Sequence, residues 1–355
     1  MRKVERIDPT KVDALRLRDA LASALSGGSA VALAPITNEQ VPDDLALLIE
    51  TGGSTGKPKV VGLSAAAMRA SARLSNQVLG ANPHDRWSLA LPLHHIAGIN
   101  QLLRAIDLGT DPVSAGGEYI SVVPTQLYRA LRDGAESLGR LKMAKAVLIG
   151  GAAVPKELVA VAKEVGIPLV TSYGMTEMCG GCIYDGIPLP GVEISINDQN
   201  TIALKGPMRA QGYFEDIEGT ERAFVGEWFI TSDEGEIGAD GRLLIHGRSD
   251  DVIISGGEKI SPALVAEFLR AQFPQTELHV LGIPDKEWGE ALRVVMVKSP
   301  EISTTSLAQI RQFVGESINR VAAPRSLLLL SEMPIKANGK LDIEALVSAP
   351  ATEAI

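Results

Sequence analysis

Residues 51–60, TGGSTGKPKV, gather in one short run the residue types that hold a phosphate group. Their glycines let the backbone approach an anion closely, because glycine carries no side chain. Thr51, Ser54 and Thr55 carry hydroxyls that donate hydrogen bonds. Lys59 adds a positive charge. The run therefore predicts a phosphate-binding loop, with a flexible surface loop of small residues as the alternative.

The run differs from the Walker sequence, G-x-x-x-x-G-K-[ST], at two places. Thr51 stands where the first glycine belongs, and Gly56 and Lys57 are followed by Pro58. Proline has no N–H to offer a phosphate, and it supplies no hydroxyl to hold magnesium. The run also lacks G-x-G-x-x-G, the dinucleotide fingerprint. These differences exclude a P-loop NTPase and argue against a Rossmann site here.

The two cysteines form the sequence CGGC, from Cys179 to Cys182. A structural zinc site needs about four ligands, and neither a third cysteine nor a nearby histidine is present in the sequence. No thioredoxin-like pattern surrounds them. We therefore expect a tight loop of small residues, with redox or metal chemistry as the alternative.

Net charge, apolar runs and cysteine content exclude several classes of protein. A net charge of −9 argues against general nucleic-acid binding, which needs a broad basic face. The N-terminal stretch has no apolar run, and SLLLLSEMPI near the end is too short to span a bilayer and is expected to form a buried strand. With only two cysteines, a disulfide framework is not expected. We expect a cytoplasmic enzyme without membrane insertion and without a nucleic-acid partner.

The spacing of apolar residues predicts the helices and strands that position these functional residues. A helix is predicted over 10–26, and another after Ser64, which is a good N-cap. The segment 44–53 is an apolar strand that enters the glycine run. Because ligands bind beyond the carboxyl ends of strands in α/β sheets, we expect four or five such ends to meet at one cleft. The other strand-and-loop segments are 87–98, 119–127, 144–155 and 167–177.

The predicted secondary structure changes after about residue 186, where short strands and turns follow one another. A helix is predicted over 263–274, and strands and helices alternate from there to the end. The predicted class is α/β: a large N-terminal domain, 1–248, of β-sheets flanked by helices, with a β-rich subdomain. A hinge at 249–251 leads to a small, mobile C-terminal α/β domain, 252–355.

Eight segments occur in one order between residues 51 and 342: TGGSTGKPKV, PLHHIAG, GGAAVP, SYGMTE, KGPMRAQGYF, TSDEGEIGADG, GRSDDVIISGGEKISP and IKANGKLD. In this order they resemble the adenylate-forming superfamily of acyl- and aryl-CoA ligases, luciferases and peptide-synthetase adenylation domains. The resemblance covers most of the chain. It implies that an acid is activated by ATP as an acyl-adenylate, with release of pyrophosphate, and is then transferred to CoA. It also implies Mg²⁺ as a cofactor.

The resemblance assigns the phosphate chemistry to particular residues. Thr176 matches the contact to the α-phosphate, and Glu177 matches the magnesium ligand. Lys340, in NGKLD, matches the lysine that bridges the attacking carboxylate and the α-phosphate. Because a carboxylate must approach a polyanion, Lys340 and magnesium neutralise charge as the bonds exchange. The loop that grips the β- and γ-phosphates supplies Thr51, Ser54, Thr55, Gly56 and Lys59.

The resemblance also assigns the nucleoside contacts. Asp233, in TSDEG, matches the carboxylate that takes both ribose hydroxyls. Arg248, in GRSDD, matches a second contact to ribose or phosphate. The segments that lie against the adenine supply Gly150, Gly151, Ala152, Tyr173 and Gly174.

For the second half-reaction the resemblance implies that the C-terminal domain rotates. Asp250 matches the hinge position, and Gly256 and Gly257 match the glycines that line the tunnel for the pantetheine arm of CoA. Lys340 is withdrawn in that state. Lys259 is a further candidate for a CoA phosphate, on charge alone.

The glycine run lies nearer the N-terminus than is usual in the superfamily, so a shortened N-terminal domain is expected. This compact form, with PLHHIAG and PLPGVEI, resembles the actinobacterial type of o-succinylbenzoate–CoA ligase of menaquinone biosynthesis. The acid would then be a dianion whose ring carboxylate needs a cation or several donors. The candidates are His95, Arg104, Ser172 and Thr176, with Gly174 leaving room for a flat ring. His95 also lies in the motif that gates the acyl pocket.

Two alternatives stay open. One is another aryl- or acyl-CoA ligase of the same superfamily. The other is a catalytically degenerate protein that binds nucleotide or acts as a scaffold, and the presence of Glu177, Asp233 and Lys340 argues against it. A shortened domain would also expose apolar surface, so a homodimer is expected.

Overall fold

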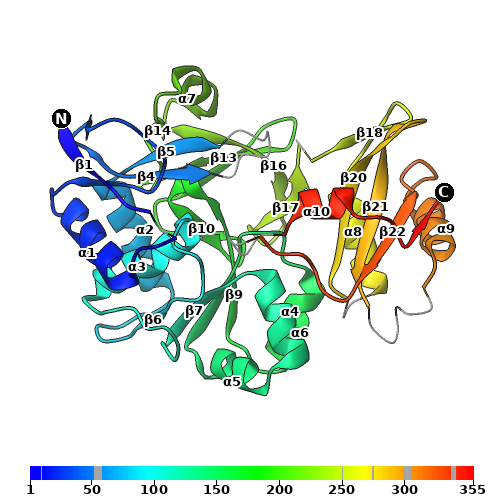
Figure 1. Cartoon of the computed structure of the whole chain (residues 1–355), viewed down its shortest axis with the longest axis horizontal. Helices are drawn as coiled ribbons and strands as arrows, with labels where there is room; N and C mark the ends of the chain where they lie inside the picture. Colours follow the sequence, from blue (N-terminus) through cyan, green and yellow to red (C-terminus); the bar gives the residue numbers. More distant parts are fainter. Residues whose placement is uncertain are drawn as a thin grey trace. The chain divides into compact units, whose positions relative to one another are not determined.

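The computed structural model describes residues 1–8, 10–51, 58–249, 251–273, 276–298, 302, 305–336 and 341–355. These fall into two compact units (Figure 1). Unit 1 comprises Met1–Ala152, Val165–Thr231 and Glu236–Leu244, and unit 2 comprises Ala153–Glu164, Ser232–Gly235 and Ile245–Ile355.

The first sheet of unit 1 has the strand order β14-β5-β4-β2-β1-β3. Strands β1, β2 and β4 run parallel, whereas β5 is antiparallel to β4, and β14 is antiparallel to β5. The predicted strand that enters the glycine run is β4, whose first five residues are all buried. The bounds are β1 Arg2–Arg6, β2 Ala30–Ala32, β3 Gln40–Val41, β4 Leu45–Thr51, β5 Lys59–Ser64 and β14 Gly212–Tyr213.

The second sheet of unit 1 has the order β11-β10-β9-β8-β7-β6. Strands β6 to β9 are parallel, so their carboxyl ends share one edge, while β10 and β11 are antiparallel. Four of the predicted loops therefore meet at this edge, and the loop after β4 belongs to the other sheet. The bounds are β6 Trp87–Ser88, β7 Tyr119–Val122, β8 Ala146–Ile149, β9 Leu169–Met175, β10 Gly180–Tyr184 and β11 Ile187–Pro188.

Three helices of unit 1 join both sheets into one core. Helix α1 (Ala14–Leu25) is shorter than the predicted 10–26, because the side chain of Asp13 caps it by accepting from the N–H groups of Leu15 and Arg16. Helix α2 (Ala65–Val78) has the predicted N-cap, with Ser64 Oγ accepting from the N–H of Ala67. Side chains of α1, α2 and α3 (Ile96–Leu108) share a single hydrophobic cluster with strands of both sheets.

The remaining elements of unit 1 are α4 (Pro124–Asp133), α5 (Ala135–Met143), the short η1 (Thr176–Met178) and α7 (Ile217–Ala223). The third sheet has the order β12-β13-β16-β15, β17 pairs with β16, and parts of β16 and β17 belong to unit 2. These short strands confirm the predicted β-rich segment. Their bounds are β12 Glu193–Ile196, β13 Thr201–Lys205, β15 Phe224–Val225, β16 Trp228–Ile237 and β17 Leu243–Arg248.

Unit 2 contains a sheet of order β19-β18-β21-β22-β23, with β20 paired to β21. The aliphatic run near the end of the sequence is β22, as predicted. Buried side chains such as Val265, Val294 and Leu327 form its core. The bounds are α6 Lys156–Glu164, β18 Ile253–Ser255, β19 Glu258–Ile260, α8 Pro262–Gln272, β20 Leu278–Asp285, β21 Gly289–Val297, α9 Leu307–Ser317, β22 Ser326–Leu330, α10 Ile343–Ser348 and β23 Glu353–Ala354.

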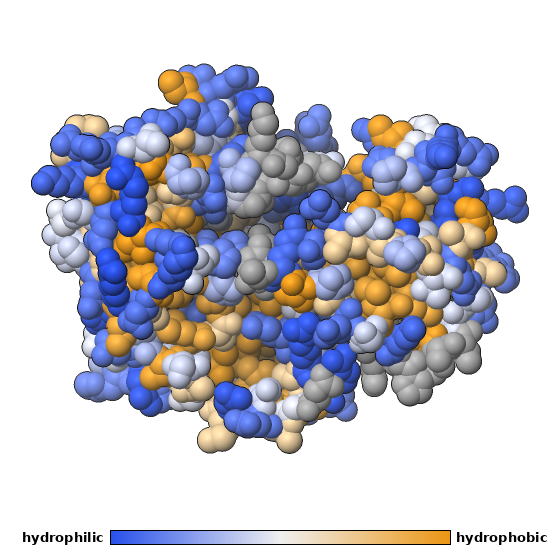
Figure 2. Space-filling view, in the orientation of Figure 1, coloured by the Kyte–Doolittle hydropathy of each residue, from blue (hydrophilic) through white to orange (hydrophobic). Residues whose placement is uncertain are grey.

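On the face that Figure 2 shows, both units expose hydrophilic and apolar side chains side by side. The large exposed apolar residues of unit 1 come from separate elements, including Leu15 on α1, Met143 on α5 and Ile217 on α7. The expected homodimer therefore stays a prediction. None of the described helices combines the length and the apolar character that crossing a bilayer requires.

Candidate nucleotide and acyl-substrate site

The two ends of the glycine run lie opposite each other in the first sheet. Thr51 ends β4, Lys59 begins β5, and the two residues are paired in register. The run thus connects antiparallel strands, whereas a P-loop leads from a strand into a helix. The residues between them, including Ser54, Thr55 and Gly56, lie outside the described residues, as does Lys340.

Lys59 and Glu177 both contact Tyr213, which lies on β14. The Nζ of Lys59 is 4.2 Å from the centroid of the Tyr213 ring. The Tyr213 hydroxyl donates to Oε1 of Glu177 at 2.9 Å, and both side chains belong to buried residues. Burial, and then the charge of Glu177, raises the pKa of Tyr213, so this hydroxyl stays protonated. The structure therefore joins the end of the phosphate run to the carboxylate assigned to magnesium.

Thr176 and Glu177 are presented by η1, directly after β9. The turn ends at Cys179, whose φ of 52° is left-handed. Ser71 Oγ and Asn100 Nδ2 donate to the carbonyl oxygen of Cys179 at 3.0 Å and 2.8 Å. These bonds from α2 and α3 hold the backbone that follows Glu177.

Tyr213, Ser71 and Asn100 are not among the site residues predicted from the sequence. Tyr213 had a signal, because it lies in KGPMRAQGYF, one of the eight ordered segments. Ser71 and Asn100 had none, since each is a polar residue within an ordinary helical pattern and acts on a residue distant in sequence.

The loop after β8 carries Gly150, Gly151 and Ala152. A Cβ on Gly150 would lie 2.5 Å from the carbonyl oxygen of Ser172 on β9, so only glycine fits this close approach. Gly151 has a φ of 80°. The structure therefore brings this loop beside Ser172, as two adjacent parallel strands require.

Strand β9 alternates its side chains between two faces. Ser172 and Gly174 share one face, and Tyr173, opposite Ile183 of β10, is on the other. A Cβ on Gly174 would lie 1.9 Å from the carbonyl oxygen of Gly180, and a Cβ on Gly181 would lie 2.1 Å from Ser172 Oγ. Close packing of β9 on β10 thus accounts for these glycines, whatever ring lies nearby.

His95 and Arg104 both lie on or beside α3. His95 is the N-cap residue, and its ring centroid is 4.3 Å from that of His94. Arg104 follows in the middle of the helix and is only 4% exposed. Its guanidinium lies 4.6 Å from the centroid of the Trp87 ring, and its Nη2 donates to the hydroxyl of Tyr184 at 3.2 Å.

The partners of the Arg104 guanidinium are neutral. Its Nη1 is 3.5 Å from the hydroxyl of Ser121, and its Nε has no hydrogen-bond partner in the part of the chain that the structure describes. A buried charge is costly unless it is paired. Arg104 is therefore a buried cation that a carboxylate would stabilise.

In unit 2, Asp233 and Arg248 lie on the neighbouring strands β16 and β17. Asp233 is 8% exposed. Its Oδ1 is 3.4 Å from Nη1 of Arg248, whose side chain is 39% exposed. The structure therefore brings together the two residues assigned to the ribose. The hinge candidate Asp250 lies outside the described residues.

Gly256 and Gly257 form the turn between β18 and β19. Their φ angles are 57° and 86°, which favours glycine at both positions. A Cβ on Gly256 would also lie 2.6 Å from Cε3 of Trp288. Lys259 is exposed on β19.

Cys179 and Cys182 are free and fully buried. Burial raises the pKa of each thiol to about 12, so neither is a thiolate near neutral pH. Among the described residues, no group of three or more His, Cys, Asp or Glu could hold a metal. Magnesium is often bound by one or two carboxylates together with substrate phosphates. A site built on Glu177 and a nucleotide fits that pattern.

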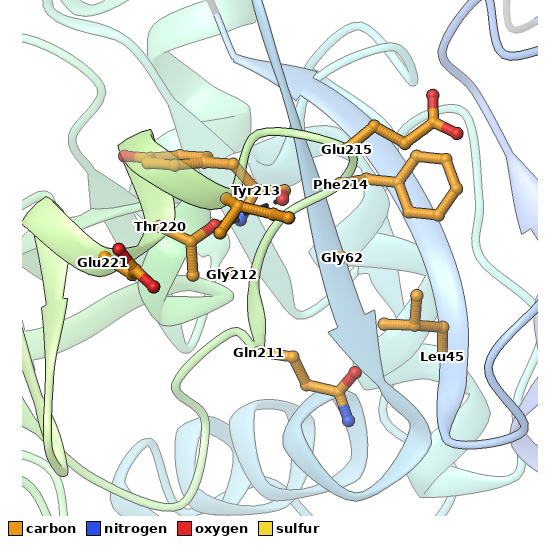
Figure 3. A pocket seen from close by; sticks show the side chains of 10 residues that line it. Leu45, Gly62, Gln211, Gly212, Tyr213, Phe214, Glu215, Thr220 and Glu221 are labelled. Carbon is orange, nitrogen blue, oxygen red and sulfur yellow. Dashed lines mark hydrogen bonds between the residues drawn. The ribbon is translucent and has the colours of Figure 1, made fainter.

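A separate surface pocket of about 290 Å³ lies beside β14 and α7 (Figure 3). It is lined by Gly212, Tyr213, Phe214 and Thr220, among others. In Figure 3 the side chains of Tyr213 and Phe214 leave the strand on opposite sides. Apart from Tyr213, which contacts Lys59 and Glu177, its walls contain none of the residues assigned above to the nucleotide, the acid or CoA.

Two family profiles match this chain. "AMP-binding enzyme" matches residues 3–214, and "AMP-binding enzyme C-terminal domain" matches residues 267–340. The second match ends at Lys340 and includes the NGK of the last ordered segment.

Curated relatives and a solved structure agree with these profiles. A Mycobacterium tuberculosis protein named "Probable 2-succinylbenzoate--CoA ligase" is 35% identical over 338 residues, which is 89% of this chain and 87% of that protein. The 2-succinylbenzoate–CoA ligase of a Geobacillus strain is 30% identical, over 84% of this chain and 68% of the relative. The o-succinylbenzoate CoA synthetase of Bacillus subtilis, solved with the acyl-adenylate intermediate OSB-AMP, has a TM-score of 0.73 and 27% identity. That match covers 99% of this chain and 84% of the solved one.

Proposed function

Because the chain belongs to the AMP-binding enzyme family, we propose that it is an ATP-dependent 2-succinylbenzoate–CoA ligase. The proposed reaction has two steps: formation of an acyl-adenylate with release of pyrophosphate, and transfer of the acyl group to CoA. The named relatives and the Bacillus subtilis complex with its acyl-adenylate support this choice of acid.

The observation that carries the proposal is the buried Arg104. Arg104 is 4% exposed, its guanidinium touches an aromatic face and two hydroxyls, and its Nε–H has no hydrogen-bond partner among the described residues. A substrate that brings a second carboxylate would supply the missing charge. A dicarboxylic aryl acid such as 2-succinylbenzoate has one carboxylate to activate and one to anchor. Ser172, Gly174 and His95 are proposed to line the same acyl pocket.

In the first step, the substrate carboxylate attacks the α-phosphorus of ATP, and the bond from that phosphorus to pyrophosphate breaks. Lys59 and the hydroxyls of the glycine run hold the departing phosphates, and Thr176 contacts the α-phosphate. Lys340 pairs with both reacting anions, a role that rests on its place in NGKLD. When bound at Glu177, magnesium supplies positive charge that offsets the phosphates.

The nucleoside is proposed to be held at both its ribose and its adenine. Asp233 accepts from the ribose hydroxyls, and Arg248 adds a donor from the next strand. The adenine is proposed to lie between the Gly150–Ala152 loop and Tyr173. These contacts position the α-phosphate for attack, which is where much of the rate enhancement originates.

In the second step, the thiolate of CoA attacks the acyl carbon, and AMP leaves with the bonding pair. The thiol reaches the adenylate along the Gly256–Gly257 turn, where a side chain would narrow a thin channel. We propose that residues 252–355 rotate about Asp250 between the steps. Homodimerisation and a location in the cytoplasm are further parts of this proposal and rest on the sequence alone.

A panel of acids in a pyrophosphate-release assay tests the proposal. With ATP, Mg²⁺ and CoA, 2-succinylbenzoate is expected to give the highest kcat/KM, above benzoate, succinate and a fatty acid. Benzoate or a fatty acid as the best substrate would instead favour the alternative aryl- or acyl-CoA ligase. If no acid in a broad set leads to pyrophosphate release, the result would favour a nucleotide-binding scaffold.

Arg104 provides a sharper version of the same test. Arg104→Lys keeps the charge but loses the planar fork. It is expected to raise the KM for 2-succinylbenzoate about tenfold or more. The substrate analogue 4-oxo-4-phenylbutanoate lacks the ring carboxylate, so its kinetics should change much less. An equal effect on both acids would contradict the anchoring role.

A further inference from the structure

One aromatic side chain links the two charged groups that flank the phosphate site. Tyr213 presents its ring face to the ammonium of Lys59, 4.2 Å from the centroid, and its hydroxyl to Glu177 at 2.9 Å. Lys59 lies on β5 and Glu177 on η1, so the two groups come from separate elements of unit 1. Tyr213 is the residue that contacts both.

The chemistry of the two contacts suits a positioning role. An aromatic face attracts a cation without neutralising its charge, so Lys59 stays available to a phosphate. A hydrogen bond to a carboxylate oxygen fixes its direction and leaves further lone pairs for other ligands. Both contacts are made by buried or half-buried groups, where they are stronger than in water.

Tyr213 is itself firmly held. It pairs with Val61 of β5, and its N–H donates to Thr220 Oγ1 at 2.9 Å. Figure 3 shows Thr220 beside the Tyr213 backbone at the surface pocket. Phe224 packs edge-on against the Tyr213 ring, with the centroids 5.4 Å apart.

The segment that carries Tyr213 also makes a backbone hydrogen bond to Glu177. The N–H of Ala210 donates to the carbonyl oxygen of Glu177 at 2.8 Å. The backbone and the side chain of Glu177 are therefore both fixed by residues 210–213. A shift of this segment would move the carboxylate and the ring under Lys59 together.

We propose that Tyr213 is a positioning residue that couples the pyrophosphate grip of Lys59 to the carboxylate of Glu177. The inference rests on the proposed function, because that function assigns Lys59 to the departing phosphates and Glu177 to magnesium. Removing the hydroxyl takes one hydrogen bond from the carboxylate alone, whereas removing the ring takes a contact from both charged groups.

The test measures nucleotide binding, so it does not depend on the identity of the acid. A non-hydrolysable ATP analogue is titrated into the wild type, Tyr213→Phe and Tyr213→Leu at a series of Mg²⁺ concentrations. For Tyr213→Phe, the Mg²⁺ concentration that gives half of the maximal gain in affinity is expected to rise about tenfold. Its affinity in EDTA should stay close to that of the wild type. Tyr213→Leu should also lose affinity in EDTA, several-fold, because Lys59 loses its ring.

The matched control is Tyr119→Phe. Tyr119 is a buried tyrosine on β7 that packs against Trp87, and its hydroxyl donates to the carbonyl oxygen of Leu79 at 3.4 Å. The change removes a buried hydroxyl and its hydrogen bond in the same unit while the ring stays, and it should leave the Mg²⁺ dependence unchanged.

The outcomes separate the two proposals. An unchanged Mg²⁺ dependence in a folded Tyr213→Phe, with normal binding by the wild type, would overturn the positioning role and leave the proposed function intact. A wild type that does not bind the Mg²⁺–nucleotide complex would overturn both. If Tyr213→Leu does not fold, Tyr213→Phe decides alone, since it keeps the ring.

Discussion

Two pairs of polar residues in this molecule, one in each unit, differ in distance and in burial. In unit 1, Tyr213 and Glu177 are each 9% exposed and share a hydrogen bond of 2.9 Å. In unit 2, Asp233 is similarly buried, but its nearest distance to Arg248 is 3.4 Å, and the arginine side chain is 39% exposed. The first pair is close and buried, and the second is long and partly solvated.

The difference in distance has a physical meaning. A distance of 3.4 Å is at the far end of the hydrogen-bonding range, so little energy is lost when a ribose hydroxyl takes its place. The bond from Tyr213 to Glu177 is charge-assisted, and breaking it would leave a buried carboxylate with one donor fewer. We infer that the phosphate end in unit 1 is preorganised and that the pair in unit 2 rearranges around its ligand.

The largest expected effect comes from a single charge in unit 2. Lys340→Ala should lower the rate of adenylation by about 100- to 1000-fold, because no other group is assigned to offset both anions. The rate of thioester formation from supplied acyl-adenylate should stay within a few-fold of the wild type. Separate assays of the two half-reactions check this, and an equal loss in both would contradict the division of roles.

The next largest effect is expected at Asp233, which lies 3.4 Å from Arg248. Asp233→Asn keeps the shape but loses the charge proposed to accept from the ribose, so the KM for ATP should rise by roughly 10- to 100-fold. Asp240→Asn, an exposed change next to the turn between β16 and β17, is the matched control. Steady-state kinetics at varied ATP measure both variants. A KM that is unchanged in Asp233→Asn would remove Asp233 from the nucleotide site.

A smaller effect is expected at the glycine turn. In Gly256→Ala the new Cβ meets Trp288 at 2.6 Å, and the φ of 57° adds strain. Thioester formation should slow at least about tenfold, because the turn must shift, while adenylation continues. Gly241→Ala, at a φ of 78° with no atom within 4 Å of its Cβ, shares the strain without the collision. Equal kinetics in the two variants would show that the contact with Trp288 is irrelevant.

The smallest effect concerns the stability of unit 2. Burial, together with the charge of Arg270 on α8, lowers the pKa of His279 on β20 to about 4. Between that value and the unfolded value of about 6.5, the unfolded chain binds the extra proton, so stability falls as the pH falls. The free energy of unfolding should drop by about 1 kcal/mol on this account between pH 7 and pH 5.5.

His279→Gln isolates that contribution. The difference in stability between pH 7 and pH 5.5 should be smaller in this variant than in the wild type by the same amount, as measured by denaturant unfolding at both pH values. The same pH dependence in both proteins would contradict the assignment to His279.

Much of the local structure followed from the sequence. The N-cap at Ser64 and the strand SLLLL are set by residues within a few positions of one another, and both form as predicted. The strand predicted from Trp87 is only two residues long. The helix predicted over 10–26 begins only at Ala14, because the side chain of Asp13 accepts from the N–H groups of the first turn and caps the helix there. Boundaries of this kind depend on single hydrogen bonds.

The candidate site was predictable only in part. The order of eight motifs determined the family and the kind of reaction, because each motif preserves residue types that the chemistry requires. Packing decided the rest. Gly174 suggested room for a flat ring, and the structure shows that the carbonyl oxygen of Gly180 already occupies the space where its Cβ would lie.

The sequence alone determined which functional groups this protein has, since motif order and residue type depend only on the chain. The tertiary structure decided which of them meet. It buried the charge of Arg104 among neutral partners and set Tyr213 between Lys59 and Glu177. These contacts join segments that are distant in sequence. They arise from strand pairing and core packing, whose energies depend on the whole fold.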